Sequence, residues 1–233
     1  MVFTSATPAA QTTPVNYESA SNANVNNYPS GGSRSSLELF DHTDFSGTTY
    51  TYSHVLNGGN NSQVGVAKSY KVYPGDKVKI EAYAKYYNPQ GSSTNLSGFA
   101  AALTAAFGVT SGSTGEAGQT YQALNDYGGF IAGGSGPGNG SFPKLFVNIL
   151  VFDKDFNFLN AAYEQIDGGL QSGVSPKANH DYMSREFEVK EAGYVFAYIS
   201  NENGTYVEGY FDDVAFTYTP SNIIQYNEYY PFG

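Results

Sequence analysis

Residues 77–87 alternate between apolar and polar side chains, and this period of two restricts the fold more than any other feature of the chain. The apolar set is Val78, Ile80, Ala82, Ala84 and Tyr86, and the other set is Lys77, Lys79, Glu81, Tyr83 and Lys85. Successive side chains of a β-strand point to opposite faces of its sheet. The segment therefore predicts a strand with one face in a core and the other face exposed.

The composition indicates sheet structure along much of the chain. Tyrosine, with 21 residues, and phenylalanine, with 16, dominate the apolar content, and both favour pleated sheets. The 27 glycines and 10 prolines supply turns between strands. At 233 residues, we expect an all-β sandwich, because such folds often form one domain of this length.

Two further segments predict strands that are buried on both faces. Residues 144–152 and 194–200 are apolar almost throughout, which is typical of strands with a covering layer on each side. The segment Tyr73-Pro74-Gly75-Asp76 has the Pro-Gly order of a type II turn. We expect this turn to join residues 63–73 and 77–87 as a hairpin.

Helical periodicity interrupts the strand pattern between residues 95 and 135. Apolar residues recur at helical spacing in two stretches, at Phe99, Leu103 and Phe107 and then at Tyr121, Leu124 and Tyr127. We therefore expect a jelly-roll β-sandwich over residues 15–220 with a two-helix insertion around residues 95–135. Two interpretations of the insertion are open: the helices shield a sheet edge, or they form a lid over a ligand.

Charge and cysteine content exclude several classes of function. The net charge is −10, the pI is about 4.6, and the 11 Lys and Arg residues form no basic run. Nucleic-acid binding and association with anionic membranes both need clustered positive charge. The chain has no cysteine, which excludes disulfides and thiolate metal sites. No apolar stretch reaches 18 residues, so we expect no membrane insertion. Residues 1–14 are expected to be a flexible leader or linker.

Three motifs follow one another near the C-terminus. They are Tyr210-Phe211-Asp212-Asp213-Val214, Ile223-Ile224-Gln225-Tyr226-Asn227-Glu228 and Tyr229-Tyr230-Pro231-Phe232-Gly233. Their order resembles the junction before the RHS-associated core in large secreted RHS/YD-repeat proteins of Bacteroidetes-type bacteria. The resemblance implies a secreted or cell-surface β-rich module, with residues 221–233 as a linker into the adjacent RHS core. It also implies that the parent is a large surface or toxin-delivery polypeptide.

The expected fold is also similar to the galactose-binding-like jelly rolls of carbohydrate-binding modules. Many of those modules carry a final-strand Phe-Asp-Asp-Val, in which an aspartate and a first-strand glutamate help to hold a structural calcium ion. The resemblance implies a structural Ca²⁺ site at Glu18, Asp212 and Asp213, with surface or turn roles for these residues as the alternative. Strict alternation cannot bury both Phe211 and Val214, so we expect a bulge or a strand end at the aspartate pair.

Tyrosines on the polar faces of predicted strands are the candidates for carbohydrate binding. Aromatic rings stack on the apolar faces of sugars, and the tyrosine hydroxyl adds a hydrogen-bonding tip. The candidates are Tyr83 and Tyr87 on one strand and Tyr50 and Tyr52 on another. The competing interpretation is that these tyrosines pack against cross-strand neighbours or against other domains of the parent protein.

No catalytic set is recognisable in the chain. A glycoside hydrolase needs two carboxylates that face one cleft, and nothing in the sequence pairs the candidates Glu81, Glu164, Glu186 and Glu188. The histidines are His42, His54 and His180; they lack a metal-binding spacing and are expected at the surface or in turns. We predict a non-catalytic module for carbohydrate or surface recognition. A structural or interaction scaffold is the main alternative, and a glycoside hydrolase is the lesser one.

Overall fold

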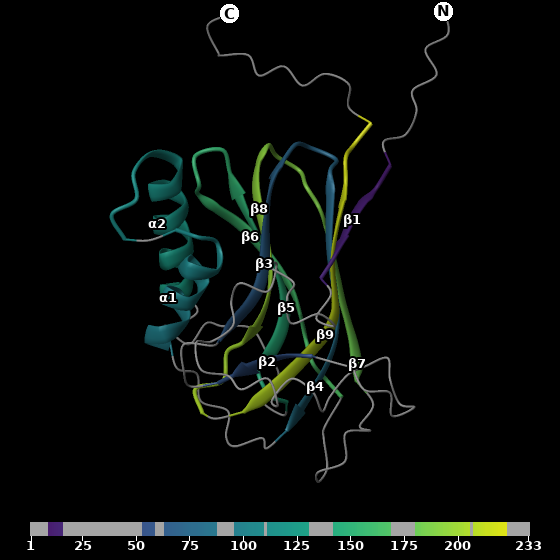
Figure 1. Ribbon diagram of the computed structural model, residues 1–233. Helices are drawn as coiled ribbons and strands as arrows, with labels where there is room; N and C mark the ends of the chain where they lie inside the picture. The colour runs from purple at the N-terminus through teal and green to yellow at the C-terminus, as the bar shows by residue number, and fades with distance from the viewer. Residues whose placement is uncertain are drawn as a thin grey trace, which may run out of the picture.

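The computed structural model of the protein describes residues 9–15, 53–58, 63–87, 96–109, 111–130, 142–168, 180–205 and 207–222. In these ranges nine strands form two antiparallel sheets (Figure 1). The first sheet, sheet A, contains β1 (Gln11–Pro14), β9 (Glu208–Thr219), β4 (Lys77–Tyr87) and β7 (Asp181–Glu188), with β2 (His54–Asn57) also paired to β9. The second sheet, sheet B, has the order β3 (Val64–Val72), β8 (Gly193–Asn201), β5 (Leu145–Asp153) and β6 (Phe158–Gln165).

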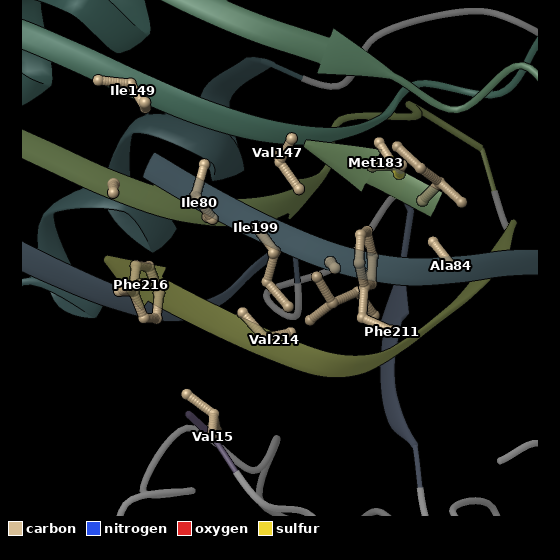
Figure 2. Close-up of a cluster of buried hydrophobic side chains, with 14 of the residues drawn as sticks. Val15, Ile80, Ala84, Val147, Ile149, Met183, Ile199, Phe211, Val214 and Phe216 are labelled. Carbon is tan, nitrogen blue, oxygen red and sulfur yellow. The ribbon is translucent and has the colours of Figure 1, made fainter. Parts of the chain in front are cut away.

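The hydrophobic core lies between the two sheets. The apolar set of β4 points into it, and Val78, Ile80, Ala82 and Ala84 are completely buried. Figure 2 shows side chains of sheet B such as Ile149 meeting side chains of sheet A such as Phe216 in this core. The predicted all-β jelly-roll sandwich with a two-helix insertion is confirmed, and the strict alternation of residues 77–87 is the direct cause of its central strand.

Helices α1 (Leu96–Ala106) and α2 (Gly115–Phe130) form a third layer on the outer face of sheet B (Figure 1). Their apolar side chains share a second core with that sheet; the buried members include Phe99, Leu103, Leu124, Tyr127, Leu150, Phe152, Phe196 and Tyr198. The helices therefore cover a face of the sheet, and the expectation that they shield a sheet edge is wrong. Within the described ranges, no helix combines the length and the apolar character that crossing a membrane requires.

Strands β3 and β4 do not form the expected hairpin, because they belong to different sheets. The type II turn itself is present: the Asp76 amide donates to the Tyr73 carbonyl over 3.0 Å, and Gly75 has a φ of 86°. Strands β3 and β4 each have one apolar face. These two faces are buried equally well whether the strands pair side by side in one sheet or face each other across the core. Alternation fixes which face of a strand is buried, but it does not fix the neighbour of that strand.

Asp76 holds the β3–β4 turn to the end of β9. Its Oδ2 accepts hydrogen bonds from the Tyr73 amide and the Tyr218 hydroxyl, both over 2.8 Å. Its Oδ1 accepts from the Ser221 amide over 2.7 Å, and the residue is only 2% exposed. The expected linker 221–233 thus begins with a residue that is bonded to the sandwich; residues 223–233 lie outside the described part of the chain.

The N-terminal boundary also differs from the expected one. Gln11–Pro14 form strand β1 and pair with residues 215–218 of β9, so the expectation of a flexible leader over residues 1–14 is wrong for these four. The hydroxyls of Thr12 and Thr217 lie 3.0 Å apart across this pairing. The Val15 amide continues the pairing by donating to the Val214 carbonyl over 2.7 Å.

We expect Asp76→Ala to destabilise the fold by about 3 kcal/mol or more, because three hydrogen-bond donors lose a buried charged acceptor. The measurement is the urea midpoint of unfolding compared with that of the unchanged protein. Asp155→Ala is the control, because the Asp155 side chain is exposed in the β5–β6 turn. Equal midpoints for the two variants would contradict the role assigned to Asp76.

Candidate functional site

Tyr83 and Tyr182 lie side by side on the outer face of sheet A. They are register partners on β4 and β7, and their ring centroids are 5.1 Å apart at an interplanar angle of 50°. Tyr182 is 47% exposed. Tyr83 was predicted from the sequence as a binding residue and Tyr182 was not, although Tyr182 precedes the buried Met183 in an alternating strand and so belongs to the exposed face of that strand.

Glu81 fixes this tyrosine pair from the next position along β4. Its Oε1 accepts hydrogen bonds from the Tyr182 hydroxyl and, over 2.7 Å, from Lys79 Nζ. Partial burial raises the pKa of Glu81, but the hydrogen bonds from Lys79 and Tyr182 outweigh burial and hold the pKa below its ordinary value. Glu81 is therefore a carboxylate, and it has lone pairs left for another donor.

The surrounding positions complete a polar surface with an aromatic centre. Ser184 lies opposite Glu81, and Glu186 lies opposite Lys79. Lys77 Nζ forms an exposed ion pair with Glu186 at 3.7 Å. We refer to residues Lys79, Glu81, Tyr83, Tyr182, Ser184 and Glu186 together as the tyrosine platform. It presents ring faces beside hydroxyl, carboxylate and ammonium groups, a combination that suits a ligand with apolar faces and many hydroxyls.

The structure tests the other carbohydrate-binding candidates only in part. The Tyr87 backbone belongs to β4, two positions beyond Lys85 and four beyond Tyr83, so its register places it on the platform side of the strand. Its side chain lies outside the described part of the structure, as do Tyr50 and Tyr52. Their assignment to sugar binding stays a prediction.

The aspartate pair in β9 forms the bulge that the sequence predicted. Asp213 has a φ of 48°, and the register between β4 and β9 shifts next to it. The extra residue lets Phe211 and Val214 both point into the core, where each is fully buried. Asp213 is exposed, whereas Asp212 is 3% exposed and accepts a hydrogen bond from the Asp213 amide over 2.8 Å.

The described residues do not complete a metal site at this bulge. No group of three or more histidine and acidic side chains in the described ranges lies close enough to hold a metal ion. Glu18, the third expected calcium ligand, lies outside those ranges. The structural Ca²⁺ site at Glu18, Asp212 and Asp213 therefore stays a prediction.

The four carboxylates considered for hydrolysis are divided between the two sheets. Glu81 and Glu186 belong to the tyrosine platform. Glu188 lies on the same strand as Glu186, and its Oε1 accepts a hydrogen bond from Lys190 Nζ over 2.6 Å. This hydrogen bond and the charge of Lys190 lower the pKa of Glu188. Glu164 lies on β6 of sheet B, where burial raises its pKa. Glu81 and Glu186, the two carboxylates of the platform, are ion-paired to lysines. An ion pair favours the ionised carboxylate, whereas a general acid must carry a proton.

Two buried titratable groups were missed by the sequence analysis. His54 is only 2% exposed in β2, which corrects the expectation of a surface or turn histidine, and burial lowers its pKa to about 4. His180 is half-buried just before β7, and His42 lies outside the described ranges. Glu202, in the connection from β8 to β9, is 3% exposed. His54 begins β2 and Glu202 follows β8, and burial at both positions depends on which segments meet in the fold.

Comparisons with known proteins give one remote structural similarity. No protein-family model matches the chain, and no curated protein sequence matches it. One solved structure comprises the CBM22-1 and GH10 modules of an N-terminal endo-1,4-β-D-xylanase from Clostridium thermocellum, complexed with xylohexaose. It shares 11% sequence identity with this chain at a TM-score of 0.34; the match covers 82% of this chain and 26% of the xylanase chain. The functional assignment therefore rests on the geometry of the tyrosine platform.

Proposed function

We propose that this domain is a non-catalytic carbohydrate-binding module and that its tyrosine platform holds the sugar chain. The observation that carries the proposal is the Tyr83–Tyr182 pair, with Tyr182 exposed and Tyr83 half-buried, held in place beside an ionised carboxylate. Because the two rings are tilted by 50°, a sugar that stacks on the face of one ring also contacts the edge of the other. An aromatic pair that is open to solvent on a sheet face suits an extended polysaccharide rather than a small enclosed ligand.

The hydrogen bond from Tyr182 to Glu81 reduces the cost of binding. An exposed tyrosine loses side-chain freedom when a ligand stacks on it, and that loss subtracts from the binding free energy. Tyr182 has already lost much of this freedom, because its hydroxyl is bound to Glu81 and its ring packs on Tyr83. The platform is therefore organised before the ligand arrives.

Electrostatics favour a neutral glycan. Lys79, which shares Glu81 with Tyr182, is paired with that carboxylate at 2.7 Å, and Lys77 is paired with Glu186. The net charge of the whole chain is −10, which repels polyanions at long range. A polysaccharide of neutral sugars satisfies the remaining lone pairs of Glu81 with its hydroxyls, whereas a polyuronate brings further carboxylates.

The parent context is part of the same proposal. The motifs at 210–214 and 223–233 support a module that precedes an RHS core in a secreted polypeptide, and an acidic surface without cysteine is compatible with an extracellular location. In that setting the domain would recognise a glycan on a surface while the adjacent RHS core forms the bulk of the parent.

A scaffold function is the second candidate, and exposed apolar residues on β6 favour it. Phe158 is 45% exposed and Leu159 is 41% exposed, and β6 is the edge strand of sheet B. Apolar groups on an unpaired edge are typical of a contact with another protein segment. This candidate predicts no glycan affinity, which separates it from the first.

We expect the domain to bind a neutral polysaccharide and Tyr182→Ala to weaken that binding about tenfold, the value expected for loss of one aromatic contact. The measurement is isothermal titration against a panel of neutral polysaccharides and one polyuronate. Tyr73→Ala is the matched control, because Tyr73 is 44% exposed in the β3–β4 turn, away from the platform. Equal losses for both variants, or binding to none of the glycans, would refute the proposal.

Calcium binding at Glu18, Asp212 and Asp213 is retained as a structural proposal, supported by the burial of Asp212 at the bulge. We expect calcium to raise the melting temperature and EDTA to reverse the rise, because an ion bound only by the folded state stabilises it. Asp212→Asn and Glu18→Gln should abolish the response, and Glu191→Gln, at an exposed position, should retain it. Identical melts in calcium and in EDTA would contradict the site.

A further inference from the structure

The chain leaves sheet B for sheet A through a buried polar connection at residues 201–203. Asn201 Nδ2 donates to the Leu56 and Val207 carbonyls, each over 2.8 Å. Asn203 Nδ2 donates to Asn201 Oδ1 over 2.7 Å. These side chains replace the ladder hydrogen bonds that end where β8 ends, and they hold the connection in one conformation.

Glu202 sits in the middle of this connection with its side chain buried. Its amide donates to the Lys144 carbonyl over 2.7 Å. A short chain of hydrogen bonds reaches its carboxyl group: Asn148 Nδ2 donates to Ser200 Oγ over 2.9 Å, and Ser200 Oγ donates to Glu202 Oε1 over 2.9 Å. The donors therefore run in one direction, from β5 through β8 to the carboxyl group.

The carboxyl group lies on the side of sheet B that the helices cover. Ser200 and Tyr198 share one face of β8, and Tyr198 packs in the second core together with Tyr127 of α2. A negative charge on Glu202 acts on both tyrosines. Burial raises the pKa of Tyr127, and the charge of Glu202 raises it further. Burial also raises the pKa of Tyr198, and Tyr127 and Glu202 add to this increase. The Tyr198 hydroxyl is buried and has no hydrogen-bond partner among the described residues.

A charge on Glu202 would be poorly compensated. Ser200 is the one side-chain donor to its carboxyl group among the described residues, and none of their cations forms an ion pair with it. Lys144 acts on it from a greater distance. Burial raises the pKa of Glu202 to about 7 in spite of the opposing effects of Ser200 and Lys144. Burying an unpaired carboxylate is costly, so the folded protein keeps the proton on this group.

We propose that Glu202 is a pH-sensitive lock: in its protonated form it keeps α2 seated on the outer face of sheet B, and its ionisation loosens this helical layer. A charged carboxylate recruits water, and Tyr127 is the residue of α2 on which the Glu202 charge acts. Loosening α2 there exposes part of the second core that it shares with sheet B. The lock thus couples external pH to the exposure of a second surface, on the side opposite the tyrosine platform.

Among the residues that the structure describes around it, Glu202 is the group with a pKa shifted to about 7. The other titratable groups that face it are Tyr198 on β8, Tyr127 on α2, Tyr163 on β6, which acts on Tyr127, and Lys144 before β5. Tyr198 and Tyr127, both members of the second core, have raised pKa values and stay neutral over this range. The remaining neighbours, Asn148 and Ser200, do not titrate.

The sign of the effect follows from the direction of the shift. The unfolded chain releases the Glu202 proton at the ordinary pKa of 4.5, whereas the folded chain retains it to about 7. Between these values the native state binds one proton more, so its stability falls as the pH rises. His54 contributes the opposite slope, because its pKa is lowered from 6.5 to about 4. The two effects oppose each other in the intact protein, and a variant is needed to separate them.

The test compares the protein with Glu202→Gln, which retains an acceptor for Ser200 but cannot ionise. We expect the ratio of their folding equilibrium constants to fall about tenfold per pH unit between pH 5 and 6.5, and about 300-fold in all. Glu191→Gln, at an exposed position, should give a constant ratio. Urea unfolding at a series of pH values measures both ratios. A pH-independent ratio for Glu202→Gln would overturn the proposal.

Hydrogen exchange of the unchanged protein tests the lock without any variant. We expect protection factors of the α2 amides, corrected for intrinsic exchange, to fall at least tenfold between pH 6 and pH 8, while those of β4 stay constant. Constant protection in α2 over that range would overturn the lock even if stability is linked to Glu202. In Glu202→Gln the α2 protection should no longer depend on pH, and a persisting decrease would assign it to another group.

Discussion

Burial of sheet B on both faces is the constraint on which the rest of the structure depends. Strands β5 and β8 face the main core with one set of side chains and the helical layer with the other. Without α1 and α2, residues such as Phe152 and Phe196 would be exposed to water at a cost of roughly 2 kcal/mol or more each. The helices are thus part of the fold, whereas part of the outer face of sheet A, at residues such as Tyr182 and Glu186, is exposed to solvent. The tyrosine platform lies on that surface.

The two sheets are joined by connections that carry buried polar side chains. Asp76 satisfies the backbone where β3 passes to β4, and Asn201 does so where β8 passes to β9. A chain that changes sheets leaves its ladder partners behind, and its free amides and carbonyls need others inside the protein. The same requirement places Glu202 in a buried position, so a pH-sensitive group arises at a point where the topology demands polar residues.

Sequence periodicity predicted the faces of the strands but not their partners. The alternation in 77–87 predicted the core-facing side chains, although Lys85 of the other set is completely buried as well. The apolar runs 144–152 and 194–200 predicted burial on both faces, and Phe211 and Val214 required the bulge at Asp213. The prediction of a hairpin between β3 and β4 was wrong, because two amphipathic strands bury their apolar faces equally well when they face each other across a core. Tyr182 and Glu202 escaped notice for a related reason: the significance of each depends on a neighbour far away in the chain.

The pairing of β1 with β9 has a mechanical consequence. Gln11 lies opposite Tyr218 and Pro14 opposite Ala215, so the chain enters the sandwich and leaves it at neighbouring points on the same edge. Tension applied through segments before β1 and after β9 would load this ladder at its end, and its hydrogen bonds would break one after another. A ladder that opens by peeling resists far less force than one sheared along its length, so β1 would detach first while the two cores stay intact.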